Sequence, residues 1–268
     1  YDLSLLASKL TFNDYSFDSI DFQYSDNSIF FNSNNIESGE FLKFNSKITN
    51  SNIFINYLDA KINNVNMYTE KVSIFNMGNE YVCNDMDLLI NDGSLHANLN
   101  FKNRTNYSID IFINNVDLNN IDKLMFLNNK YDGLLNGTIN ISQLRPERLL
   151  KADLFIDNLR IDEFKYLKSS FDANINDKRI FINQFKGQNN LSSFDISGFI
   201  ELDRNLKLSD NNKVDLRGEI YNFDISILNN YLPWVIDIGG NITSKFLISG
   251  MLDNIRFDMS PTITNPRF

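Results

Sequence analysis

The stretch Tyr107-Ser-Ile-Asp-Ile-Phe-Ile113 decides the fold class that we expect for this chain. Taking every second position separates its residues into two sets, Tyr107, Ile109, Ile111 and Ile113 in one, and Ser108, Asp110 and Phe112 in the other. Because successive side chains of a β-strand point to opposite faces, the first set forms an apolar side. The stretch is therefore predicted to be a strand with one buried face.

The same alternation recurs along the sequence. It is found at residues 53–57, 95–101, 154–156, 194–202, 214–220, 242–248 and 255–259. Turn-forming residues separate the runs, as in Asn-Asp-Gly at 91–93 and Ser-Asp-Asn-Asn-Lys at 209–213. Short alternating runs between such turns are typical of an all-β protein. We expect an all-β meander, in which Ile53, Ile55 and Tyr57 share one face.

Two short segments have helical spacing instead. Residues 117–125 and 224–232 each begin with an aspartate, Asp117 and Asp224, followed by apolar residues three or four positions apart. An aspartate at the start of a helix accepts hydrogen bonds from the free N–H groups of the first turn. Pro233 would end the second helix. Both segments are predicted to be short helices whose apolar sides pack on the sheet.

These two helices belong to an internal repeat. The interval between Asp117 and Asp224, 107 positions, also separates Gly133 from Gly240 and aligns the alternating residues before and after. Long-period similarity is typical of arrays in which each repeat packs on its neighbours. The sequence predicts a β-groove segment with a weak repeat at 1–94, a repeat at 95–201 and a second, incomplete repeat at 202–268. We expect one continuous segment of a longer protein.

Composition and rare residues exclude several classes of function. The formal net charge is -9, and no cluster of Lys and Arg suggests a phosphate-binding surface, so no nucleic-acid partner is expected. Cys83 and His96 are each the single residue of their type, which excludes an internal disulfide and histidine-based triads. Asp85 and Asp87 are predicted to lie on a solvated strand face. We expect no metal, no cofactor and no enzymatic activity.

A longer stretch resembles a known family. Residues 232–250 carry Gly240, Ile242, Ser244, Phe246, Ile248 and Gly250 at alternate positions. The first copy of the repeat carries Gly133, Leu135, Gly137, Ile139 and Ile141. This pattern, a short helix followed by a glycine-bearing strand, resembles the recurring block of the TamB/AsmA-like family over roughly residues 95 to 260. The sequence departs from that block at Gln143, which stands where the family has glycine.

The resemblance implies an elongated, curved antiparallel β-sheet folded like a taco, or a repeating β-groove, with a few short helices between repeats and an apolar interior that shields acyl chains. Family members are anchored in the inner membrane and lie in the periplasm of diderm bacteria, and they resemble bridge-like lipid transfer proteins. The implied function is phospholipid transport between the inner and outer membranes in support of outer-membrane biogenesis. The implied partners are phospholipids, both membranes through parts outside this segment, and an outer-membrane β-barrel protein.

The expected site is a collective apolar surface. An apolar sheet face must be covered by a second layer, by itself or by a bound molecule. We predict that acyl chains cover a lipid-binding groove lined by Ile109, Ile111, Ile113, Leu135, Ile139, Ile141, Leu154, Ile156, Leu216, Ile220, Ile242, Phe246 and Ile248. The alternative is a secreted or surface β-sandwich or solenoid with a dry core. A carbohydrate-active protein ranks last, because the sequence reveals no carboxylate pair facing a cleft beside exposed aromatic residues.

Overall fold

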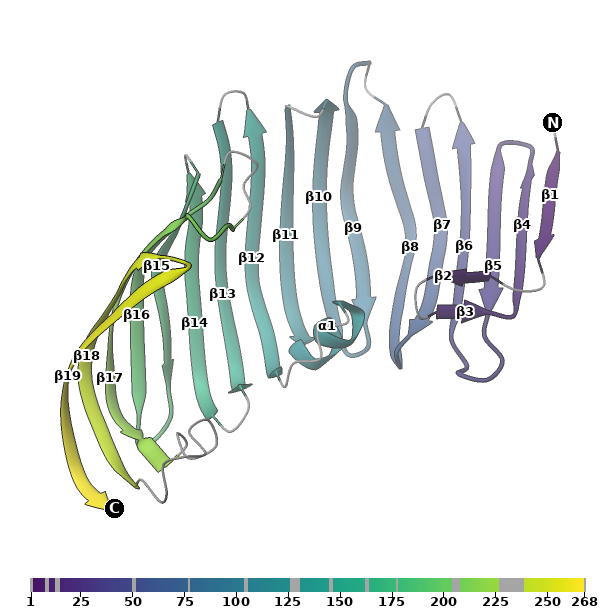
Figure 1. Cartoon of the computed structure of the whole chain (residues 1–268). Helices are drawn as coiled ribbons and strands as arrows, with labels where there is room; N and C mark the ends of the chain where they lie inside the picture. Colours follow the sequence, from purple (N-terminus) through teal and green to yellow (C-terminus); the bar gives the residue numbers. More distant parts are fainter. Residues whose placement is uncertain are drawn as a thin grey trace. The chain divides into compact units, whose positions relative to one another are not determined.

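A computed structural model describes most of the chain. The described residues are 2–7, 10–12, 15–49, 52–76, 78–103, 106–125, 131–144, 147–161, 164–176, 178–203, 208–226 and 239–267. Within them the protein is antiparallel and all-β, with one α-helix (Figure 1). The predicted fold class is therefore confirmed. The chain divides into two compact units, which we call unit 1 (Tyr1–Asn129 and Ser142–Arg145) and unit 2 (Lys130–Ile141 and Pro146–Phe268).

Unit 1 is a curved antiparallel sheet built from consecutive hairpins. Its strands are β1 (Leu3–Ala7), β4 (Ser19–Ser25), β5 (Ser28–Asn34), β6 (Phe41–Thr49), β7 (Asn52–Ile62), β8 (Val65–Asn76), β9 (Tyr81–Ile90), β10 (Gly93–Asn103) and β11 (Asn106–Asp117). Strand β1 pairs with β4, and each later strand pairs with the next. The short strands β2 (Leu10–Phe12) and β3 (Tyr15–Phe17) form a separate hairpin. Helix α1 (Leu118–Met125) follows β11.

Unit 2 contains the remaining strands. They are β12 (Tyr131–Leu144), most of which belongs to this unit, β13 (Glu147–Ile161), β14 (Phe164–Asn176), β15 (Arg179–Gln188), β16 (Ser193–Glu201), β17 (Lys213–Asp224), β18 (Gly239–Met251) and β19 (Asn254–Arg267). From β13 to β19 each strand pairs antiparallel with the next. The last strands of this unit, β17–β19, curve strongly (Figure 1).

Helix α1 confirms the first predicted helix. The Asp117 side chain accepts a hydrogen bond of 2.8 Å from the backbone N–H of Asn119, as expected for a residue at the helix start. The apolar side of α1 packs through Ile121 and Leu124 on a buried cluster that includes Val65 and Val116. This packing supports a helix of eight residues, which is too short to be stable by itself.

The second predicted helix is described only at its start. The Asp224 side chain accepts a hydrogen bond of 2.9 Å from the backbone N–H of Ser226, which matches the bond at Asp117. Residues 225–226 are 3₁₀-helical, and the rest of the predicted segment, residues 227–232, lies outside the described residues.

Left-handed asparagines interrupt the strands at repeated positions. Asn115 and Asn222 both have a φ of 51°, and Asn158 and Asn265 have values of 54° and 50°. Each pair keeps the interval of the sequence repeat, although the repeat was identified without these residues. Gly133 and Gly240, which also keep it, have φ values of 134° and 122°. The backbone therefore follows the repeat. The predicted borders at 94 and 201 remain a prediction.

A β-bulge in strand β7 makes one predicted face assignment wrong. Strand β7 has an extra residue, Asn56, so that Ile55 lies opposite Ser46 while Tyr57 lies opposite Asn45. An inserted residue of this kind is a β-bulge, and it changes the side to which later residues point. Tyr57 therefore lies on the face opposite to Ile53 and Ile55, contrary to the simple alternation.

Candidate functional site

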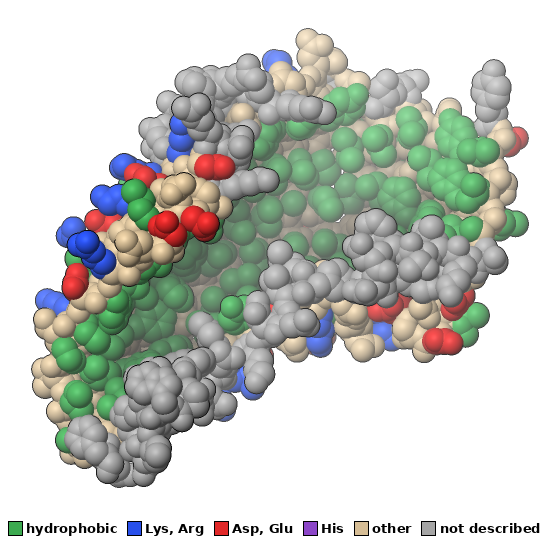
Figure 2. All heavy atoms as spheres, in the orientation of Figure 1, with side chains coloured by type: hydrophobic (Ala, Val, Ile, Leu, Met, Phe, Trp, Pro, Cys, Tyr) green, Lys and Arg blue, Asp and Glu red, His purple; other side chains and the backbone are tan. Residues whose placement is uncertain are grey.

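The first three predicted groove residues lie on the apolar face of unit 1. Strand β11 pairs with β10 so that Ile109, Ile111 and Ile113 face Leu99, Ala97 and Leu95 in turn. The row continues into β9, where Leu88 lies opposite Leu95. Phe112 points to the other face and is 46% exposed. Figure 2 shows hydrophobic side chains gathered on the face of β4–β11 that is turned to the viewer.

The other predicted residues belong to strands of unit 2. Pairing from β13 to β19 produces a continuous cross-strand row of one face, made of Leu154, Phe171, Phe185, Ile196, Gly218, Phe246 and Met259. The next row along the strands places Leu216 opposite Ile248. The remaining predicted residues of these strands, Ile156, Ile220 and Ile242, share this apolar face by the same pairings.

Strand β12 carries the last three predicted residues. Leu135 is buried, whereas Ile139 and Ile141 are half-buried. They occupy alternate positions around Gly137, which lies against Leu154 of β13. The alternation places them on one side of the strand.

An aromatic cluster occupies the middle of the apolar face of unit 2. The Phe194 ring lies 4.8 Å from the Tyr166 ring and 4.9 Å from the Phe185 ring, centroid to centroid, and both contacts are edge-to-face. The Phe194 ring also lies over Gly187, where a Cβ would come within 2.4 Å of it. Burial raises the pKa of the Tyr166 phenol above its usual value. The cluster was not predicted, because its members lie on separate strands.

The apolar face of unit 2 is only partly buried. Most of its side chains on β14–β18 are half-buried by their neighbours, and those on the last strand, β19, are more open, with Phe257 57% exposed. The described strands of this unit form a single layer. Within the described part of unit 2, no second sheet packs on this face.

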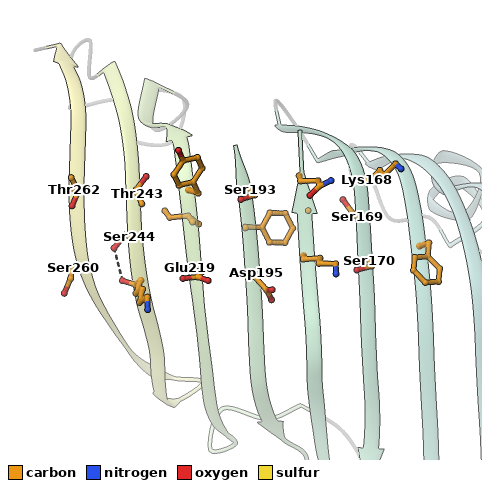
Figure 3. A pocket seen from close by; sticks show the side chains of 18 residues that line it. Lys168, Ser169, Ser170, Ser193, Asp195, Glu219, Thr243, Ser244, Ser260 and Thr262 are labelled. Atoms are coloured by element: carbon orange, nitrogen blue, oxygen red, sulfur yellow. Dashed lines mark hydrogen bonds between the residues drawn. The ribbon is translucent and has the colours of Figure 1, made fainter. Parts of the chain in front are cut away.

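A hollow of about 830 Å³ lies over the opposite, polar face of unit 2 (Figure 3). Two cross-strand rows of side chains form its walls, and the backbone of the row between them, which includes Gly187 and Ser244, forms its floor. One wall follows the order Ser170, Lys186, Asp195, Glu219, Lys245 and Ser260. We call this site the polar hollow. The sequence alone does not reveal this site, because its residues come from separate strands and become neighbours only when those strands pair in this register.

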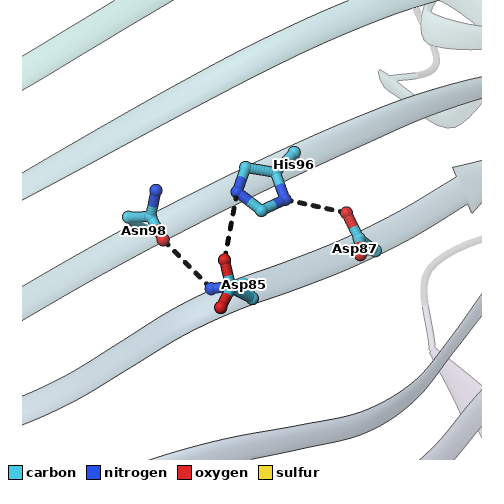
Figure 4. A network of polar contacts seen from close by, with 4 residues as sticks. All are labelled: Asp85, Asp87, His96 and Asn98. Atoms are coloured by element: carbon cyan, nitrogen blue, oxygen red, sulfur yellow. Dashed lines mark hydrogen bonds and ion pairs between the residues drawn. The ribbon is translucent and has the colours of Figure 1, made fainter.

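The single histidine lies between two aspartates on the polar face of unit 1 (Figure 4). His96 Nδ1 is 2.8 Å from Asp87 Oδ1, and His96 Nε2 is 3.7 Å from Asp85 Oδ1. The carboxylates lie at opposite nitrogens of the ring, so the three side chains do not converge on one point. Within the described residues, no group of three or more His, Cys, Asp and Glu is arranged to hold a metal ion.

The lone cysteine lies on the apolar face of unit 1. Cys83 is 4% exposed and pairs with Leu99 on one side and Ile74 on the other. Burial, followed by the negative charge of Asp85, raises the pKa of its thiol. The thiol is therefore a poor nucleophile here.

Comparisons with models of protein families, with curated proteins and with solved structures find no match for this chain. None of the helices in the described parts is both long enough and apolar enough to cross a membrane.

Proposed function

We propose that the apolar faces of this chain shield phospholipid acyl chains, as the resemblance to the TamB/AsmA-like family implies. In this proposal the chain is a carrier and not an enzyme, and it belongs to a protein that connects the inner and outer membranes through the periplasm. The observation that carries the proposal is the apolar face of unit 2, over which the described residues place no second sheet.

The hydrophobic effect is large enough for this role. Burial of an acyl chain of about 16 carbons contributes on the order of 10 kcal/mol, at roughly 0.8 kcal/mol for each CH₂ group. A surface of this kind needs no polar contact to hold the chain.

A dry structural or adhesion module is the alternative. Such a module would cover the apolar face with protein, as two packed sheets do in a β-sandwich. The side chains of the apolar face, such as Phe246 and Ile248, are only half-buried, so a dry module would need a further protein layer to bury them fully.

The proposal is tested by native mass spectrometry of the purified chain, followed by extraction and identification of bound lipid. We expect several phospholipids for each chain. Lipid-free protein, purified from membranes without detergent and still folded by circular dichroism, would contradict the proposal and support the dry module.

Matched substitutions make the test specific for the face. Ile111→Asp places a charge on the apolar face of unit 1, and Phe112→Asp places it on the next residue of the same strand, on the polar face. Phe246→Asp and Leu247→Asp form the same kind of pair in unit 2. We expect the apolar-face variants to lose lipid and their controls to keep it.

A further inference from the structure

We propose that the polar hollow of unit 2 binds a linear oligosaccharide, at a site separate from the apolar face. The hollow crosses the strands from β13 to β19. Six intervals between neighbouring strands correspond to about 29 Å at roughly 4.8 Å for each interval. This length suits a chain of several sugar rings.

Two carboxylates face the hollow from neighbouring strands. Asp195 of β16 lies directly opposite Glu219 of β17 (Figure 3). Residues in this relationship have Cβ atoms about 4.5–5.5 Å apart, and like charges there repel each other. Sugar hydroxyl groups donate hydrogen bonds, and two adjacent carboxylates accept them well because charged acceptors form strong hydrogen bonds.

Lysines flank the carboxylates on both sides, and their charges offset the repulsion between Asp195 and Glu219. Lys186 lies opposite Asp195, and Lys245 lies opposite Glu219. No ion pair among the described residues joins any of these four side chains. Asp195 accepts a hydrogen bond of 3.0 Å from the Gln184 side chain, which fixes one of its oxygens. The row thus offers donors at both ends and acceptors in the middle.

Two exposed aromatic rings complete the walls. Tyr221 is 62% exposed and Phe155 is 52% exposed, and both line the hollow. Both belong to the polar face, where the fold leaves the rings exposed to water. Flat aromatic rings beside hydrogen-bonding side chains match a pyranose ring, which has apolar C–H faces and a polar edge.

Other ligand classes fit less well. A peptide that adds to a sheet pairs with a free strand edge, whereas the floor backbone of the hollow already takes part in the strand ladder on β14–β18. An acyl chain would leave the four charged side chains without polar partners. A polyanion would be attracted by the lysines but repelled by Asp195 and Glu219.

The experiment is isothermal titration calorimetry of the purified chain with three defined probes: cellohexaose, hexa-N-acetylchitohexaose and maltohexaose. We expect at least one of them to bind. We also expect binding to change little as salt rises, because neutral sugars are not held by long-range charge. Absence of binding by all three, or binding that salt abolishes, would overturn the proposal.

Matched variants test whether the ligand binds in the polar hollow. Asp195→Asn with Glu219→Gln keeps the shape and removes both charges, and we expect affinity to fall about tenfold or more. Tyr221→Ala is expected to weaken binding as well. Asp153→Asn, on the same face but outside the hollow, is the control and should bind like the parent chain. Equal affinity of the double variant and the parent would overturn the assignment. Bound lipid should be the same in all of these variants.

Discussion

The ring of Phe246 on β18 lies against Gly218 on β17, so closely that a Cβ on residue 218 would be 2.5 Å from the ring Cζ. The same arrangement occurs at Phe194 and Gly187. In both pairs an aromatic side chain lies over the backbone of a neighbouring strand, which keeps the ring low on the apolar face. Only glycine leaves enough room for the ring at these positions, since the Cβ of any other residue would push the ring away from the backbone.

Gly218→Ala tests this relationship. The added methyl group must displace the Phe246 ring or the strand, and we expect a loss of about 1–3 kcal/mol in the free energy of unfolding. Urea denaturation measures it. The double variant Gly218→Ala with Phe246→Ala should lose less than the sum of the single changes, because the clash with the ring is then absent and only the close approach to the backbone oxygen of Asp195, at 2.8 Å, remains. Additive losses would show that the ring and the glycine do not interact.

The left-handed asparagines predict a second substitution pattern. Asn158 has a φ of 54°, which is costly for a β-branched residue. We expect Asn158→Val to lose about 1–2 kcal/mol of stability and Asn158→Gly to lose less, because glycine adopts this conformation readily. The matched control is Asp157→Val on the preceding, exposed residue. A control as destabilising as Asn158→Val would refute the backbone explanation.

The buried thiol predicts a pH dependence. Burial raises the pKa of Cys83, so the thiol remains protonated at a pH where an exposed cysteine has begun to ionise. Folded protein should therefore react with iodoacetamide much more slowly than protein unfolded in urea. The protonated thiol stabilises the fold below the pKa of the unfolded thiol, and this contribution is lost as pH rises through the folded pKa.

Mass spectrometry measures the alkylation directly, because the chain has one cysteine. Asp85→Asn removes the smaller cause of the raised pKa, so it should accelerate the reaction slightly and leave it far slower than in urea. Equal rates in folded and unfolded protein would mean that Cys83 is accessible.

Period-two alternation predicted strands β7, β10, β11, β13 and β16–β19 and most of their faces, but it did not indicate β4–β6, β8, β14 or β15. It separated Ile111 from Phe112 correctly, because β11 is regular up to Asn115. It was wrong at Tyr57, because the extra residue Asn56 reverses the face to which the following residues of β7 point. Asparagine is so frequent in this sequence that its left-handed positions have no distinct signal, and only their recurrence in the repeat could have revealed them.

Contacts between strands could not be read from alternation alone. Asp195 and Glu219 are far apart in the sequence, and they face each other only because of the register of β16 and β17. The same holds for Tyr166 and Phe194, whose rings meet across β15. A prediction of hairpin registers from the turns would have been needed to find either site.

The central claim, that lipid covers the apolar faces, is tested most directly by photocrosslinking. Benzoylphenylalanine is introduced separately at residues 111 and 112, and at 246 and 247, and crosslinked lipid is detected by mass spectrometry after irradiation in cells. The account predicts phospholipid adducts at Ile111 and Phe246, and none at their neighbours Phe112 and Leu247, which point to the other face. Adducts at all four positions alike, or protein adducts alone at Ile111 and Phe246, would contradict it.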